Sequence, residues 1–110
     1  MVRIDIKPMS ANAAYYGKLT KTSAHRKYIK YVGYLLPTIK LPESPYELYL
    51  EFGFSSEGSD IDNPVKILTD ILSKKYGFND NLIYRAVIEK KIVPKGKEYK
   101  RFEIKHYGTL

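Results

Sequence analysis

The sequence predicts a single α+β domain, with helices packed on one face of a mostly antiparallel or mixed sheet. Three observations predict this class. The chain has 110 residues, of which 44% are hydrophobic, which suffices for one core and one domain over residues 1–110. Segments with the period of a strand alternate with segments of helical period. No repeat or linker divides the chain. The expected order is strand, helix, strand, helix, strand, strand.

The first half of the chain is expected to hold two strands and one helix. Residues 2–7 alternate apolar and polar side chains, as a half-buried strand does, and residues 9–22 are expected to be irregular. Thr22 or Ser23 can cap a helix that runs to about Leu36, before Pro37. The alternation in residues 46–54 predicts the second strand.

The second half is expected to begin with a helix and to end with a hairpin. Asn63 and Pro64 suit a helix start, and Gly77 suits the end of that helix region. Residues 82–93 have the composition of a strand, and residues 99–105 that of the returning strand. The turn Pro94-Lys95-Gly96-Lys97 separates them.

The charge of the chain narrows the class of partner. Nineteen Lys and Arg against twelve Asp and Glu give a net charge of +7, which by itself is equally compatible with a nucleic-acid partner and with a solvated basic surface. The clustering of the cations on either side of a group of carboxylates favours nucleic acid. The chain has no cysteine, and no apolar run is long enough to cross a bilayer. The first residues resemble no secretory signal. We therefore expect a cytoplasmic protein without a membrane partner.

A cluster of carboxylates lies between two basic blocks of the sequence. The first block comprises Lys18, Lys21, Arg26, Lys27 and Lys30, and the second comprises Lys90, Lys91, Lys95, Lys97, Lys100, Arg101 and Lys105. If residues 60–62 are extended, Asp60 and Asp62 point to the same side, and a hard divalent cation would stabilise them. Lys66 follows closely enough to hold a phosphate at the same site. The alternative is that both aspartates only favour a helix N-terminus, by about 0.3–1 kcal/mol each. His25 and His106 lie outside this cluster, and we assign them no catalytic role.

The segment DIDNPVKILTDILSKKYGFNDNLI, residues 60–83, resembles the signature of the RusA family of Holliday junction resolvases. The spacing of its aspartates, asparagine and lysine is similar to the family pattern. The opening Pro8-Met9-Ser10-Ala11-Asn12, followed by Tyr15 and Tyr16, is similar to the start of that family. The resemblance covers nearly the whole chain. It implies a RusA-like fold and an endonuclease that depends on Mg²⁺, with Mn²⁺ as the alternative ion.

The resemblance also implies roles for individual residues. Asp60, Asp62 and Asp80 match the metal-binding aspartates, and Lys66 matches the essential lysine. Asn63, Asp70 and Asn79 are expected to support them, with Asp70 paired to Lys66 at i,i+4 spacing. Asn79 stands where the family often has an aspartate, so it cannot act as a base.

The position of Asp80 depends on the length of the helix before it. A helix that ends near Ser73 leaves enough chain for Asp80 to return to Asp60, whereas a helix that continues to Lys75 does not. In the second case Asp80 is expected to complete a site across a dimer interface.

The expected reaction is the resolution of four-way junction DNA by paired nicks, and a symmetric homodimer would place one site on each of two strands. Three alternatives stay open. The first is a nuclease for flaps or single strands with the same metal site, the second is a non-catalytic basic module that binds DNA or RNA, and the third is a small subunit that works only within a larger assembly. Tyr15 and Tyr16 are expected to pack rather than to stack at the junction centre. The expected DNA contacts are Lys18, Lys21, Arg26, Lys27, Lys30, Lys95 and Lys97.

Overall fold

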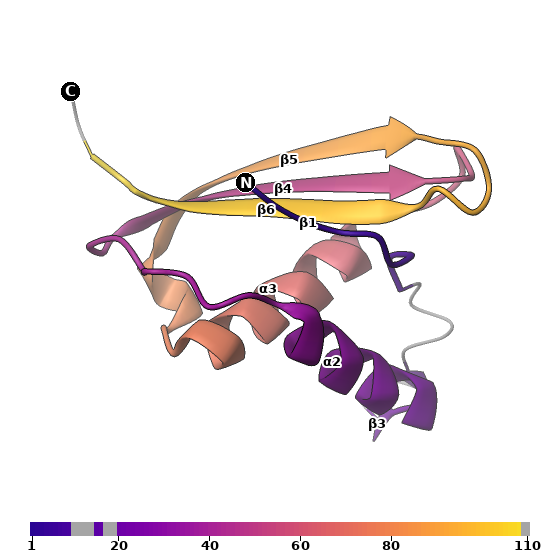
Figure 1. Ribbon diagram of the computed structural model, residues 1–110, viewed down its shortest axis with the longest axis horizontal. Coiled ribbons are helices and arrows are strands. Elements are labelled where there is room, and N and C mark those ends of the chain that lie inside the picture. The colour runs from indigo at the N-terminus through magenta and orange to yellow at the C-terminus, as the bar shows by residue number, and fades with distance from the viewer. Residues whose placement is uncertain (10–14, 17–19, 109–110) are drawn as a thin grey trace.

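A four-stranded mixed sheet forms one layer of the protein, and two helices form the other (Figure 1). The structure, a computed structural model, describes residues 1–9, 15–16 and 20–108, with residues 15, 16 and 20 described through their backbone alone. The strand order in the sheet is β1-β6-β4-β5. Within the described residues, this arrangement confirms the expected α+β class.

The strands comprise β1 (Val2–Ile4), β4 (Tyr46–Phe54), β5 (Ile83–Ile92) and β6 (Tyr99–His106). β6 lies antiparallel to both β1 and β4, whereas β5 pairs with β4 in the parallel direction. The sheet is therefore mixed, and β1 and β5 are its edges. The expected C-terminal hairpin is wrong, because β4 lies between β5 and β6 and pairs with both. A separate short hairpin joins β2 (Tyr15–Tyr16) to β3 (Thr20–Lys21).

Both long helices cover the same face of the sheet (Figure 1). α2 (Ser23–Leu35) begins at Thr22, whose hydroxyl accepts a hydrogen bond from the His25 amide at 3.0 Å. α3 (Asp62–Tyr76) ends at Gly77, whose φ of 72° is the left-handed conformation that glycine adopts most readily. Apolar side chains of the two helices meet the inward side of β4 and β6 in one core: Val32, Leu36, Ile67, Leu68, Ile71, Leu72, Leu48, Leu50, Phe52, Phe54 and Phe102.

Strand β4, helix α3 and strand β5 form a β-α-β unit. β4 runs toward the loop of residues 55–61, α3 returns across the sheet, and the 3₁₀ turn η1 (Asp80–Leu82) leads into β5. Because β4 and β5 are parallel, the start of α3 lies at the carboxyl end of both strands, and the end of α3 lies at their amino end. This topology decides which of the expected site residues can meet within one chain.

The face of the sheet that no helix covers, here called the open face, carries a polar network. The side chains of Glu51 and Tyr99 are buried on this face, and the Tyr99 hydroxyl donates a hydrogen bond of 2.5 Å to Glu51. The Tyr99 ring occupies the space in which a Cβ at Gly53 would stand, so glycine is required there. Burial raises the pKa of Glu51, but hydrogen bonds from Tyr99 and Tyr49 outweigh it, and the net pKa is lowered.

One lysine is buried in the layer between sheet and helices. Lys100 of β6 is 1% exposed, and its ammonium donates to the carbonyl of Ile6 at 2.8 Å and lies 4.8 Å from the centre of the Tyr28 ring. Burial lowers the pKa of Lys100 to about 7, because the charged form loses its hydration. In the part of the chain that the structure describes, no helix is long and apolar enough to cross a membrane.

Candidate metal centre and basic surface

The loop of residues 55–61 carries the first candidate ligand to the start of α3. Asp60 is exposed at the end of this loop, and Asp62 is exposed in the first turn of the helix. Both therefore lie at the carboxyl end of the parallel strands β4 and β5. That edge is where open α/β sheets place their ligands. The unsatisfied N–H groups of the first helical turn also favour negative charge at this position.

The condition under which Asp60 and Asp62 would point to the same side of a strand is not met, because Ile61 is not extended. Its φ of −92° and ψ of −23° are helical, and its carbonyl accepts the first hydrogen bond of α3 from the Val65 amide at 2.9 Å. Asp62 thus belongs to the helix, one residue before the expected start. Pro64 lies in the first turn, where its missing N–H costs no hydrogen bond. Asp60 and Asp62 therefore lie where a loop leads into a helix, not at alternate positions of a strand.

Asn63, expected to support the site, has an unsatisfied amide. Its side-chain nitrogen Nδ2 is buried and has no hydrogen-bond partner among the described residues. An orphaned buried donor is costly, by about 1–3 kcal/mol, unless a ligand or water accepts from it. The amide is therefore suited to an oxygen ligand that binds beside Asp62.

Lys66 projects from the exposed side of α3. Asp62, Lys66 and Asp70 follow one another at i,i+4 spacing, so they lie on one side of the helix, and all three are exposed. The expected pairing of Lys66 with Asp70 is not formed: among the described residues, no ion pair within 4.0 Å involves Lys66. Its ammonium is thus available to an external anion.

Asp80 lies at the opposite end of α3 from Asp60 and Asp62. The helix continues to Tyr76, past the length that would allow a return, and its fifteen residues span ~22 Å. The ring of Phe78 packs against Tyr46 at the amino end of β4, with 5.2 Å between the ring centres, so the segment before Asp80 is held there. Across the described residues, no group of three or more His, Cys, Asp or Glu side chains could hold one metal ion.

The structure gives Asn79 a local role. Its side-chain oxygen accepts a hydrogen bond of 3.1 Å from the Asn81 amide and caps η1. Asn79 therefore holds the backbone of the segment in which Asp80 is exposed.

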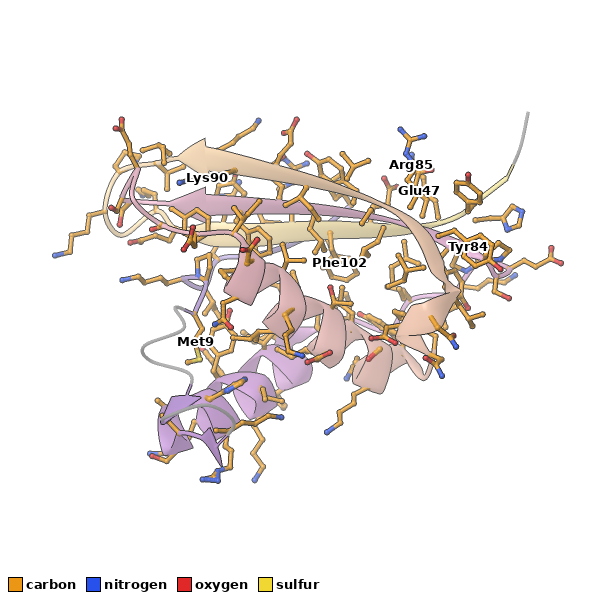
Figure 2. All side chains as sticks on the ribbon, turned by 180° about the vertical axis from the view of Figure 1, so that it is seen from behind. Met9, Glu47, Tyr84, Arg85, Lys90 and Phe102 are labelled. Atoms are coloured by element: carbon orange, nitrogen blue, oxygen red, sulfur yellow. The ribbon has the colours of Figure 1, made fainter. Side chains whose placement is uncertain are left out.

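Lys90 is a residue of the candidate site that the sequence reasoning missed. It extends from β5 on the helix side of the sheet, near the start of α3 (Figure 2). Its ammonium donates hydrogen bonds to the carbonyls of Glu57 at 2.7 Å and Ser59 at 2.6 Å. These bonds hold the loop immediately before Asp60. The only signal in the sequence was membership of the second basic block, which does not reveal which loop a lysine contacts.

The side chains at the start of α3 resemble the ligands of an open magnesium site more than those of a closed structural metal site. Mg²⁺ is usually bound by one or two carboxylates and completes its shell with water and substrate phosphate oxygens. Asp60 and Asp62 provide two exposed carboxylates, and the Asn63 amide needs an acceptor. One chain thus offers two exposed carboxylates at the start of α3, and a magnesium ion held there would need further oxygen ligands.

The two basic blocks differ in how their charges are used. Those in or next to α2 are exposed, as expected: Lys21, Arg26, Lys27 and Lys30. Lys18 lies outside the described residues, as do the side chains of Tyr15 and Tyr16. Most cations of the second block have partners within the fold: Lys90 holds a loop, Lys91 and Arg101 lie near Glu51, and Lys105 pairs with Glu103.

Two lysines of the second block remain exposed near the candidate site. Lys95 and Lys97 belong to the turn between β5 and β6. A hydrogen bond of 2.8 Å from the Val93 amide to the Phe54 carbonyl joins this turn to the start of the loop of residues 55–61. Both lysines are thus at the same end of the sheet as Asp60.

The chain matches no family model, and no curated protein sequence is significantly similar to it.

Proposed function

We propose that the chain is a metal-dependent DNA endonuclease of the RusA type that resolves four-way junctions by paired nicks. The observation that carries this proposal is the group formed by Asp60, Asp62 and Lys66 at the start of α3. Two carboxylates provide ligands for a cation, and a lysine that forms no ion pair with any described residue provides an anchor for a phosphate. Their spacing is also that of the family signature.

Each residue of this group has a distinct task in the proposed reaction. Asp60 and Asp62 would hold Mg²⁺, which supplies Lewis acidity at the scissile phosphate. Lys66 binds a non-bridging phosphate oxygen and stabilises the negative charge that develops on it during hydrolysis. The Asn63 amide donates to an oxygen of the bound backbone, which would satisfy its buried nitrogen. Lys90 positions Asp60 through the two carbonyls that it holds.

Asp80 enters the proposed site from a second copy of the chain. It lies one helix length from Asp62 in its own chain, and it is exposed. A two-fold interface that sets the start of one α3 beside the end of the other would create two composite sites, because such an interface uses the same surface twice. Two sites related by a two-fold axis match a substrate that requires two symmetric nicks.

The experiment that tests this function is a nicking assay on a synthetic four-way junction, with flap and linear duplex substrates alongside. We expect symmetric cuts in opposing strands of the junction with Mg²⁺ and none with EDTA. Asp62→Asn should abolish cleavage but preserve junction binding, whereas Lys66→Ala should lower the rate far more than the affinity. Unchanged cleavage by Asp62→Asn would remove Asp62 from the site, and preferred cutting of flaps would favour the single-strand nuclease.

A non-catalytic basic module is the second candidate. It is favoured by the position of Asp62 in the first turn of α3, where a carboxylate stabilises the helix dipole without any metal. This candidate requires no divalent ion for binding and predicts no cleavage of any substrate. If the protein bound the junction equally well in Mg²⁺ and in EDTA and nicked no substrate, the result would favour the basic module over the endonuclease.

A further inference from the structure

A basic groove runs between α2 and α3 on the outer side of the helical layer. Its floor contains Ile29 and Ile71, and one hollow along it has a volume of about 530 Å³. Its rim, here called the groove cations, comprises six side chains from both helices and from the end of β3: Lys21, Arg26, Lys27, Lys30, Lys74 and Lys75. Asp70 is the one carboxylate among the described residues that line the groove.

The charge of this groove is not compensated within the fold. Among the described residues, each ion pair lies on the open face of the sheet or at its β1 edge, and none involves a groove cation. Figure 2 shows one such pair, Arg85 and Glu47, on the side of the sheet away from the helices. The groove cations therefore keep their positive charge for a partner.

The helix dipoles affect the groove cations of α2 and of α3 in opposite ways. Lys74 and Lys75 lie in the last turn of α3, where cations are favoured without any ligand. Arg26 and Lys27 lie near the start of α2, whose first turn has no acidic residue, and cations there oppose the dipole. An anion in the groove would offset this unfavourable arrangement.

We infer that this groove binds the sugar–phosphate backbone of a DNA duplex arm, with Lys74 and Lys75 as contacts in addition to those on α2. The groove is open and its cations are spread along both helices, which suits a continuous polyanion better than a compact ligand. From Lys74 to Asp62 the helix spans ~18 Å, or about five base-pair steps of duplex DNA. The choice of DNA as the polyanion rests on the proposed function.

The test measures junction binding in EDTA, where cleavage does not occur. The double variant Lys27→Gln, Lys74→Gln removes one cation from each helix. We expect the dissociation constant to rise about tenfold, and the slope of log affinity against log salt to become shallower by about 2, as the loss of two phosphate contacts requires. Lys27→Arg, Lys74→Arg should restore both quantities.

The matched control, Lys91→Gln, Lys105→Gln, makes the same change in net charge on the open face. It should alter affinity less than twofold, and thermal melts should show that both double variants are folded. If both double variants lost the same affinity for the junction, net charge alone would explain the effect, and the inference would be overturned. The inference would also be overturned if the native protein bound phosphatidylserine vesicles but no DNA, and if the groove variant lost that vesicle binding. If the groove variant alone loses DNA binding but no substrate is ever cut, the groove stands and the endonuclease fails.

Discussion

The ammonium of Lys90 lies 2.6 Å from the carbonyl oxygen of Ser59, although 31 positions separate the two residues. Ser59 immediately precedes Asp60, so a side chain of an edge strand holds the backbone of the candidate metal centre. The same ammonium bonds to the Glu57 carbonyl and lies 5.7 Å from the centre of the Phe54 ring. Lys90 is thus a positioning residue for Asp60.

Replacing Lys90 with methionine should loosen this loop and slow cleavage. Methionine keeps much of the apolar stem but removes the donor, so the carbonyls of Glu57 and Ser59 lose their charge-assisted hydrogen bonds. We expect amide hydrogen exchange in residues 56–61 to accelerate, the magnesium midpoint for cleavage to rise, and the rate to fall about tenfold. The free energy of unfolding should fall by only about 1 kcal/mol, because the bonds are near the surface.

Lys91→Met is the control for this variant, because Lys91 is adjacent in the sequence but lies near Glu51 on the open face. It should leave loop exchange and cleavage unchanged, and Lys90→Arg should recover part of the lost rate. Normal exchange in residues 56–61 of the Lys90→Met protein would show that the two carbonyl contacts do not hold the loop.

The helices and strands could be predicted from the sequence more fully than the arrangement of the candidate site. Each element depends on residues that are close in the sequence, whereas the site depends on residues that are distant in it. Strand β4 matches the predicted residues 46–54, because alternation is a local property. The predicted stop at Gly77 is also confirmed. The position of Asp80 depended on whether Lys74 and Lys75 continue α3, and either outcome was compatible with their composition. They do continue it, in the last turn, where the helix dipole favours them.

Contacts between segments that are distant in the sequence had no local signal. Nothing in residues 83–92 indicates that Lys90 reaches the carbonyl of Ser59, and nothing in residues 99–106 indicates that Lys100 is buried against Ile6. Both lysines belong to the second basic block of the sequence. The fold uses them internally, so net charge overstated the number of cations that the last two strands can offer to a partner.

Acid should weaken the network around Glu51. Because the pKa of Glu51 is lowered in the folded protein, its ionised form contributes stability above the ordinary value of 4.5, and this contribution is lost as the pH falls through the folded pKa. Glu51→Gln should destabilise the protein by about 1–2 kcal/mol at pH 7, and the difference from the native protein should shrink between pH 5 and pH 3. Urea unfolding at several pH values measures this. A difference that stays constant down to pH 3 would contradict the lowered pKa, and Glu103→Gln on the same face is the control.

Alkali should strengthen the fold through Lys100. Its pKa is lowered by burial from 10.5 to about 7, so between these values the unfolded chain binds more protons than the folded one, and stability rises with pH. The native protein should gain free energy of unfolding from pH 7 to pH 9 relative to Lys100→Met, which lacks the titrating group. Below pH 7 the difference between the two proteins should level off. Parallel curves over the whole range, from urea unfolding, would show that Lys100 does not titrate there.

Mixing two inactive variants tests whether Asp80 acts across a dimer. If each site combines Asp60 and Asp62 of one copy with Asp80 of another, a mixed dimer of Asp62→Asn and Asp80→Asn retains one site in which every residue is native. Each variant alone should then be inactive on a four-way junction, whereas the mixture should nick one strand per junction. A mixture of Asp62→Asn with Asp60→Asn should stay inactive, because both changes lie at the same end of α3 and neither dimer site escapes them. An inactive first mixture, under conditions in which subunits exchange, would confine the reaction to one chain, and a fully active Asp80→Asn protein would remove Asp80 from the site altogether.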